Sequence, residues 1–377
     1  QQAIYYLKYK DWPEFVTPLL KKIRYLAEKS TLRDGLYFLT KKFISETEDY
    51  LEIIQEKRKY NPYLQEQNDQ LDQYYHQEKL RLGIDMFSRN IVVNAKYKPT
   101  FFDRILEQIQ NNDDLSNNPN LQVYKATFTM INSPENTGHY FQMKSLLEEH
   151  IQRFPEREQL ALHSYMLNYC VRKINSGATE FYAEVLELYK LLLNEGLLLV
   201  DGFLTQWTYI NIVTAGLRLK NFAWTEQFIY QYKSALMKEY QENVFNYSLV
   251  SLYFEKGDWG SALELLQQVD FTDGFYQMAA RITQLKIYYL SEEWEAFGSL
   301  ILATQRFLSR NKQLSTYQKK SNLNFLRIIN RLFKFKMKAK YLGRKRFQEQ
   351  QEKILIRINE THPLGNKSWL KEQYYLL

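Results

Sequence analysis

The chain has 377 residues, of which 45% are hydrophobic, 16% aromatic and 25% charged, and its formal net charge is +7. This apolar content excludes a disordered chain, and the single cysteine, Cys170, excludes an intrachain disulfide framework and a multi-cysteine metal site. Only 13 glycines and 8 prolines are present, too few for the many tight turns of a sandwich or barrel. The composition therefore predicts long elements with few corners.

Helical periodicity begins in the N-terminal part, which we expect to be an irregular helical region over 1–110. Apolar residues recur there at three-, four- and seven-residue steps, as one buried helix face requires. This spacing predicts two long helices, at about 32–60 and 64–93, and Ser30 resembles the cap of the first. The polar stretch 111–120 is predicted to be a loop.

Beyond residue 120 the breaks between helices come at short intervals. No segment alternates apolar and polar residues as a half-buried strand would. We therefore predict an all-α fold, with helical repeats over 120–310 and basic helices over 311–377 that cap them. The predicted helices are 121–132, 139–153, 156–174, 179–194, 203–219, 223–240, 243–255, 259–269, 274–290, 293–309, 314–340, 344–359 and 367–374.

The segment 246–269 carries the pattern of a repeated helix pair. Gly257 and Asp258 form a turn, Trp259 begins the second helix, and Ala262 follows one turn later. We expect the aromatic ring to be buried against the first helix and the small residue to let the helices approach. The same pattern recurs 35 residues later, 37 residues earlier and, in part, at the start of the chain: at Glu293, Trp294 and Phe297; at Asn221, Phe222 and Thr225; and at Asp11, Trp12 and Pro13.

This pattern resembles the tetratricopeptide repeat (TPR), most clearly over 243–309. The resemblance implies a right-handed α-solenoid of antiparallel helix pairs, with an extended surface for partner proteins. In such proteins the first helix of each pair lines the groove. Carried onto this chain, the residues expected to bind a partner there are Asn246, Tyr253 and Tyr288. The chain departs from the family's pattern at Val250, where a small residue is usual, and in lacking the closing proline after the 246–269 segment.

No pattern typical of catalysis or cofactor binding occurs in the sequence. The phosphate-binding, dinucleotide-binding, nucleophile-elbow and zinc-helix motifs are absent. His150 and His163, with Glu148 and Glu149 nearby, form either a local cluster or ordinary hydrogen-bonded histidines. Cys170 lies on an apolar helix face, which is typical of a packed thiol. We therefore predict a protein that is not an enzyme and uses no metal or cofactor.

A strongly basic segment follows the repeats. Residues 310–348 contain 13 lysines and arginines and no acidic residue, which leaves the rest of the chain net acidic. Such segregation produces a local positive field. Apolar residues at helical spacing let one face of this segment pack, while the cations fall on or near the opposite face. The predicted partner-binding patch consists of Arg327, Arg331, Lys334, Lys338, Arg344, Lys345 and Arg346.

Four interpretations of the basic segment are open. Its cations are paired with acidic residues of preceding helices, or they dock an acidic protein segment, a nucleic acid or an anionic membrane surface. The absence of a nucleic-acid motif weighs against docking of a nucleic acid. The need to pack the apolar residues weighs against docking on an anionic membrane surface. Together with the solenoid, this predicts a protein–protein interaction scaffold; the alternative is a nucleic-acid-associated or other polyanion-binding protein that uses 310–348.

Location and assembly are less constrained by the sequence. No run of about 18 apolar residues occurs, so we expect no membrane insertion. The single cysteine favours a reducing, cytoplasmic compartment. The sequence starts at Gln1 with no methionine and no apolar signal core, so we expect a fragment from which a targeting segment could have been lost. Nothing in the sequence predicts an oligomeric state.

Overall fold

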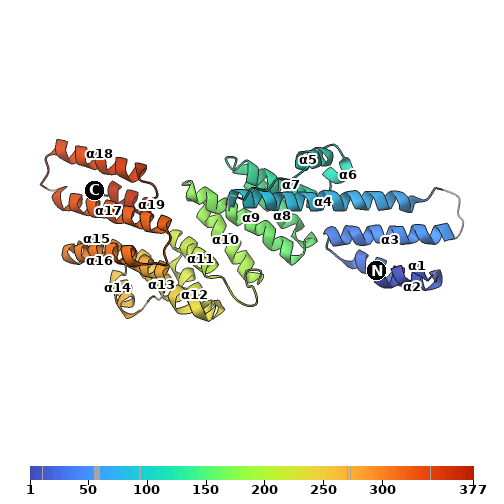
Figure 1. Cartoon of the computed structure of the whole chain (residues 1–377), viewed down its shortest axis with the longest axis horizontal. Coiled ribbons are helices and arrows are strands. Elements are labelled where there is room, and N and C mark those ends of the chain that lie inside the picture. The colour runs from blue at the N-terminus through green and yellow to red at the C-terminus, as the bar shows by residue number, and fades with distance from the viewer. Residues whose placement is uncertain (11, 55–59, 93–94, 270, 272, 340) are drawn as a thin grey trace. The chain divides into compact units, whose positions relative to one another are not determined.

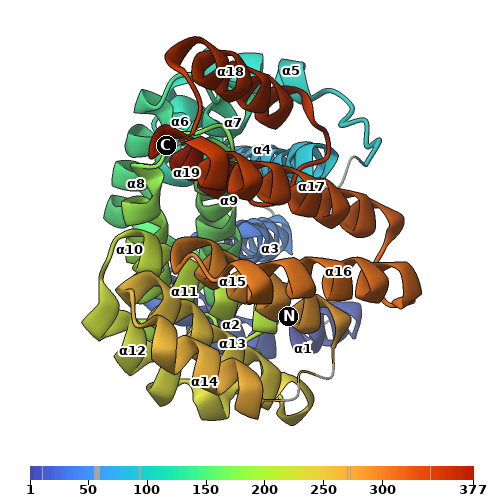
Figure 2. The same ribbon diagram turned by 90° about the vertical axis from the view of Figure 1, so that its left-hand side faces the viewer.

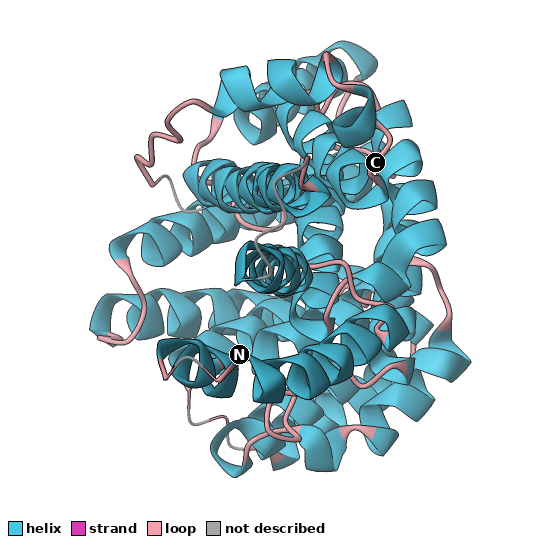
Figure 3. Cartoon of the chain, turned by 90° about the vertical axis from the view of Figure 1, so that its right-hand side faces the viewer, coloured by secondary structure: helices cyan, strands magenta, loops and turns pink. Residues whose placement is uncertain are grey.

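The computed structural model describes residues 1–377 except 11, 55–59, 93–94, 270, 272 and 340. These described residues form nineteen α-helices and two short 3-10 helices, with no β-strand (Figure 3). The prediction of an all-α fold is confirmed. The chain divides into two compact units, Gln1–Leu198 and Leu199–Leu377. The border between these units lies inside the range 120–310 that the sequence assigns to one block of repeats.

The first unit begins with four helices, of which the third and fourth are the two long ones expected from periodicity (blue in Figure 1). Ser30 ends the second helix, and it is Asp34 that caps the third, by accepting a hydrogen bond from the Tyr37 amide (2.9 Å). Asp11 and residues 55–59 and 93 of the expected elements lie outside the described residues. The four helices are α1 (Gln2–Tyr9), α2 (Pro13–Lys29), α3 (Gly35–Ile54) and α4 (Pro62–Val92).

The remainder of the first unit contains six further helices around a buried aromatic cluster. Tyr140 and Tyr169 stack with ring centroids 5.4 Å apart, and Phe181 meets both rings edge-on. Cys170 is fully buried beside them, and burial raises the pKa of its thiol to about 12, as expected of a packed thiol. The helices are α5 (Phe102–Gln110), α6 (Asp113–Ser116), α7 (Pro119–Asn132), α8 (Gly138–His150), α9 (Glu156–Asn175) and α10 (Phe181–Asn194). The stretch predicted to be a loop thus contains one short helix, α6.

The second unit consists of nine helices, coloured yellow to red in Figure 1. The single helix expected at 223–240 is wrong, because the buried Leu236 is extended and separates α12 from α13. The helices are α11 (Gln206–Arg218), α12 (Phe222–Gln231), α13 (Lys238–Lys256), α14 (Trp259–Gln268), α15 (Gly274–Leu290), α16 (Trp294–Arg310), α17 (Thr316–Ala339), α18 (Arg344–Glu360) and α19 (Lys367–Tyr375).

Three turns of the second unit share one geometry at the predicted intervals. A residue in the left-handed region ends each first helix, and an aromatic residue begins the next helix two positions later. The residue three positions after each of these aromatic residues has a fully buried side chain. The left-handed residues are Lys220 (φ 55°), Gly257 (φ 80°) and Glu292 (φ 59°), and the buried ones are Thr225, Ala262 and Phe297.

The predicted burial of Trp259 and Trp294 is wrong, because both rings are only half-buried. The residue that anchors α16 is instead Phe297, which is fully buried and stacks on Phe333 of α17 with ring centroids 3.9 Å apart. The Trp294 ring also contacts Phe333, with ring centroids 4.3 Å apart and the planes tilted by 51°. Aromatic packing therefore holds α17 against α16 and leaves the other side of α17 facing α18 and α19 (Figure 2).

Lys286 of α15 is enclosed by neighbouring elements of the second unit. Its ammonium group donates a hydrogen bond to Oδ1 of Asn366 (2.7 Å) and lies over the rings of Phe254 and Trp369. Burial lowers the pKa of Lys286 to about 8, and the positive charge of Arg218 acts in the same direction. In the unfolded chain, the pKa of this lysine returns to its ordinary value of about 10.4. Between these values the unfolded state binds more protons than the folded state.

We expect the unfolding free energy of the second unit to rise between about pH 8 and about pH 10, by on the order of 1–2 kcal/mol from this group. Lys286→Met should remove that rise, because methionine fills similar space and does not titrate. Urea denaturation of both proteins at a series of pH values checks this. If the unfolding free energies of the wild type and the variant rose equally with pH, the lowered pKa would not belong to Lys286.

Candidate anion-binding groove

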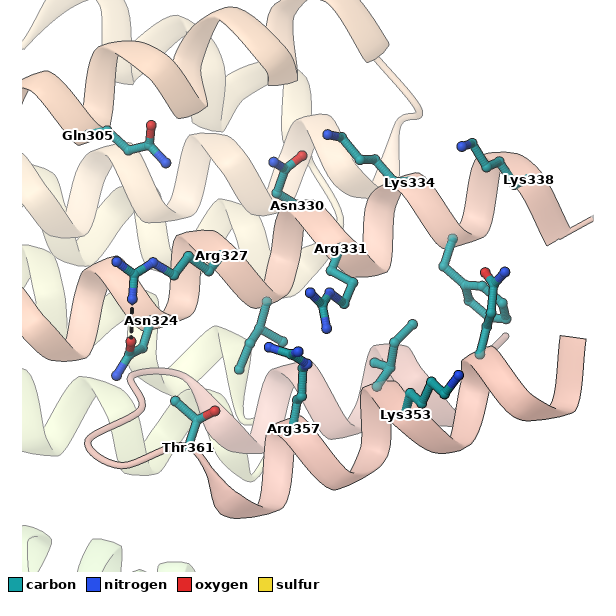
Figure 4. Close-up of a pocket in the computed structure, with 14 residues that line it drawn as sticks. Gln305, Asn324, Arg327, Asn330, Arg331, Lys334, Lys338, Lys353, Arg357 and Thr361 are labelled. Carbon is teal, nitrogen blue, oxygen red and sulfur yellow. Dashed lines mark hydrogen bonds between the residues drawn. The ribbon is translucent and has the colours of Figure 1, made fainter. Parts of the chain in front are cut away.

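A groove with a volume of about 680 Å³ runs between α17 and α18 of the second unit and reaches Gln305 on α16 (Figure 4). Six cationic side chains line it, together with several amides and one hydroxyl, and none of the described residues that line it is an aspartate or glutamate. We call this site the basic groove. Its cations are Arg327, Arg331, Lys334 and Lys338 of α17 and Lys353 and Arg357 of α18.

Helical spacing explains why these cations share one side. Steps of four, three and four residues keep the four cations of α17 on one stripe. The opposite stripe is apolar, and its side chains Phe325, Ile329 and Phe333 are buried against the rest of the unit. On α18 the two cations are four residues apart, and each precedes a buried isoleucine, Ile354 or Ile358. Packing of the two apolar stripes thus forces the two basic stripes to border the groove.

The centre of the groove holds two arginines that face each other. Arg331 of α17 and Arg357 of α18 point toward one another in Figure 4. Burial lowers the pKa of Arg331, and the like charge of Arg357 acts in the same direction. An arginine stays charged at neutral pH even so. Two positive charges are therefore held opposite each other, and none of the residues described in the groove lining carries a carboxylate.

One end of the groove is held in place by hydrogen bonds. Arg327 donates to Oδ1 of Asn324 (3.4 Å), and Nδ2 of the same amide donates to the carbonyl oxygen of Pro363 (2.8 Å). Because the loop before α19 fixes the amide, the arginine is oriented along the groove. Lys334, Lys338 and Lys353 lie on the other side of the central arginines (Figure 4).

Internal pairing accounts for one cation of the basic segment. Lys336 forms an ion pair with Oε1 of Glu292 (2.8 Å), and its ammonium lies 5.3 Å from the centre of the Tyr289 ring. Lys340, one of the thirteen cations of the segment, lies outside the described residues. In the part of the chain that the structure describes, none of the six groove cations has a carboxylate within the 4.0 Å of an ion pair.

The structure divides the patch predicted from the sequence. Four of its residues, Arg327, Arg331, Lys334 and Lys338, line the groove. The other three occupy the first turn of α18 after Gly343, where they are exposed and outside the groove. These three are Arg344, Lys345 and Arg346.

Two groove cations, Lys353 and Arg357, were not predicted from the sequence, because acidic residues interrupt the basic run before them. The signal that could have found them is their four-residue spacing beside an apolar stripe of the same spacing on α18.

The residues predicted from the TPR resemblance lie elsewhere. Asn246 and Tyr253 belong to α13 and Tyr288 to α15, all three are half-buried, and none lines the basic groove. The Tyr288 hydroxyl accepts a hydrogen bond from Nε2 of Gln284 (2.9 Å), and its ring packs on the core of the unit. A partner surface at these residues stays a prediction.

A second groove, of about 580 Å³, lies in the first unit and was not predicted from the sequence. It gathers four carboxylates, Asp34, Glu78, Asp85 and Glu158, from different segments, which a local pattern cannot indicate. Burial raises the pKa of Glu158. Three of these carboxylates have partners inside the second groove. Arg81 pairs with Glu78 (2.7 Å), Arg89 pairs with Asp85 (3.0 Å), and the Tyr124 hydroxyl donates a hydrogen bond to Glu158 (2.6 Å).

The histidines do not form a shared site. Nδ1 of the buried His163 lies 2.8 Å from the carbonyl oxygen of Gln159, and burial lowers the pKa of this histidine. His150 lies 3.8 Å from a Glu149 carboxylate oxygen. Among the described residues, no three or more His, Cys, Asp or Glu side chains gather in a way that could hold a metal ion. No helix within the described part of the chain is long and apolar enough to cross a membrane.

No family model matches this chain, and neither the curated proteins nor the solved structures contain a match. The two grooves differ in how far their own charges are neutralised. The groove of the first unit neutralises most of its own charge, whereas the basic groove does not. The basic groove is the stronger candidate for binding a charged partner.

Proposed function

We propose that this chain is a non-enzymatic binding protein whose basic groove docks a polyanionic partner, namely an acidic segment of another protein. One observation carries the proposal: six cations line a single groove to which the described part of the chain contributes no carboxylate. Like charges held together raise the free energy of the unbound protein. A polyanion in the groove removes that repulsion and gains charge-assisted hydrogen bonds from the arginines.

We further propose that α11 to α16 are three TPR-like helix pairs of a right-handed α-solenoid. The contacts support this: α11 packs on α12, α13 on α14 and α15 on α16, while the first helices of successive pairs also touch one another. The shared geometry of the three turns supports it as well. In such a stack each pair covers the apolar face of its neighbour, and α17 packs on α16 of the last pair. The solenoid then serves as the scaffold that presents the basic groove.

A protein partner is favoured over a nucleic acid by the lining of the groove. Proteins that bind single strands stack bases on exposed aromatic rings. The one aromatic side chain that lines the basic groove is Phe335, which is only 3% exposed. The groove offers charge and hydrogen-bond donors without a stacking surface, which suits an acidic peptide.

Titration of the full chain with fluorescent polyglutamate tests the proposed function. We expect binding that weakens as salt is added, because the contacts are between solvated charges. The triple variant Lys334→Gln, Lys338→Gln, Lys353→Gln should bind at least about tenfold more weakly. The matched control Arg344→Gln, Lys345→Gln, Arg346→Gln removes the same number of charges outside the groove and should change affinity less than about twofold.

Melting curves of both triple variants establish that each is folded. Equal weakening by the two triple variants would mean that binding follows net charge, and the groove would not be the site. Absence of binding by the wild-type chain would also overturn the proposal.

A further inference from the structure

The centre of the basic groove has a different chemistry from its ends. Arg331 and Arg357 face each other from two different helices, whereas the cations on one side of this pair, Lys334, Lys338 and Lys353, are lysines (Figure 4). A guanidinium is a planar fork that binds two oxygens of one anion, while an ammonium acts as a point charge. Two facing forks therefore define a place for one compact anion with several oxygens.

Charge matching selects the anion. A single carboxylate carries one negative charge and neutralises only one of the two arginines. A phosphomonoester carries about −1.5 to −2 at neutral pH and has three acceptor oxygens, enough for both forks. Among the described residues, no carboxylate lines the groove at Arg331 and Arg357. Partial burial lowers the pKa of Arg331, and the unneutralised charge of Arg357 adds to that effect.

We propose that Arg331 and Arg357 clamp a phosphomonoester group, so that the segment docked in the basic groove is phosphorylated. This inference rests on the proposed function, and it specifies the partner as a phosphorylated acidic segment of a protein. Phosphorylation of that segment would then control docking, because the clamp loses most of its contacts when the phosphate is absent.

The lysines predict what surrounds the phosphate. Arg331 and Lys338 are seven residues apart, which is about 10 Å along a helix. An extended peptide covers that distance with about three residues. Acidic residues within about three positions of the phosphorylated one, on one side of it, therefore meet Lys334, Lys338 and Lys353. A nucleic-acid backbone fits less well, because each phosphodiester carries a single charge and the groove offers no ring for stacking.

The full chain is tested with three fluorescent peptides that share flanking glutamates and differ only at the centre, which is phosphoserine, serine or glutamate. We expect the phosphoserine peptide to bind at least about tenfold more tightly than the serine peptide, and more tightly than the glutamate peptide. Inorganic phosphate should compete with the phosphoserine peptide more effectively than with the serine peptide. Oligothymidylate, tested as a nucleic acid probe, should bind more weakly than the phosphoserine peptide.

Two charge-preserving variants test the clamp directly. Arg331→Lys and Arg357→Lys keep the charge and remove one fork each. Either should weaken binding of the phosphoserine peptide by a larger factor than binding of the serine peptide, and so abolish most of the preference for phosphoserine. Arg346→Lys, outside the groove, is the matched control and should keep the full preference. Melting curves establish that each variant is folded.

Each alternative result is informative. Equal affinity for the phosphoserine and serine peptides overturns the clamp, and the proposed function stands if the triple glutamine variant still weakens both. Loss of all peptide binding in the wild type overturns both proposals. Tighter binding of oligothymidylate, weakened by Arg331→Lys, would replace the phosphopeptide with a nucleic acid. An unchanged phosphoserine preference in both clamp variants would also overturn the inference.

Discussion

The substitution Arg331→Glu is expected to abolish polyanion binding by the basic groove while slightly stabilising the unit Leu199–Leu377. Arg331 faces Arg357 across the groove, and like charge at this place raises the free energy of the folded protein. A glutamate there faces the guanidinium of Arg357 and replaces repulsion by attraction. The gain is less than about 1 kcal/mol because the site is exposed to solvent. Binding should fall at least about a hundredfold, because a negative charge then stands at the centre of the site.

The matched control is Arg344→Glu, which changes the net charge by the same amount outside the groove. We expect it to alter neither the melting temperature nor polyglutamate affinity by much. Thermal melting and fluorescence titration of the two variants side by side give both quantities. A lower melting temperature for Arg331→Glu would show that Arg331 stabilises the fold through contacts other than those described, and retained binding would remove it from the site.

The second large effect is expected from Phe297→Ala, which should cost about 3–5 kcal/mol of unfolding free energy. The Phe297 ring is fully buried and stacks on Phe333 at 3.9 Å, so its removal leaves a cavity between α16 and α17. Because α17 forms one wall of the basic groove, destabilising this contact should also weaken polyanion binding near the unfolding temperature. Urea denaturation measures the first effect and titration at rising temperature the second.

Trp294→Ala is the comparison that makes the Phe297 prediction specific. Trp294 contacts Phe333 with ring centroids 4.3 Å apart but is half-buried, so its loss removes less packing and leaves an open surface instead of a closed cavity. We expect a clearly smaller cost than for Phe297→Ala. If the two variants unfold alike, the position of the anchor on α16 is misassigned.

Some helix ends in the second unit were predictable because the signals for them are local, whereas the start of α13 at Lys238 was not, because one helix was predicted over 223–240 and the next from 243. Gly257 and Asp258 end one helix and cap the next through bonds within a few residues, and the predicted helix 274–290 agrees with α15 at both ends. The N-terminal cap of α3 could not be predicted from the sequence, because Ser30 and Asp34 both have side chains that can cap a helix. The choice between them follows from where the chain can turn after α2. That depends on contacts such as the bond from the Arg33 amide to the carbonyl oxygen of Arg153, far away in the sequence.

The burial of individual side chains was less predictable than the helices that carry them. Aromatic residues at the starts of helices mark the repeat, and Trp294 was therefore expected in the core. Burial depends on which neighbouring helix covers a position, and α17 covers Phe297 more completely than Trp294. The border between the units Gln1–Leu198 and Leu199–Leu377 was not predicted either, because a break between two units and a break between two helices look alike in a sequence.

By itself, the sequence determined that the chain is helical and that 310–348 holds cations without acids, because periodicity and charge are properties of neighbouring residues. Only the tertiary structure decided which cations act together. The packing of α17 on α18 brings Lys353 and Arg357 opposite Arg331 and leaves Arg344, Lys345 and Arg346 outside. A groove between two helices depends on which faces their apolar stripes bury, and that choice is made by side chains from α15, α16 and α19 that lie far from the groove in the sequence.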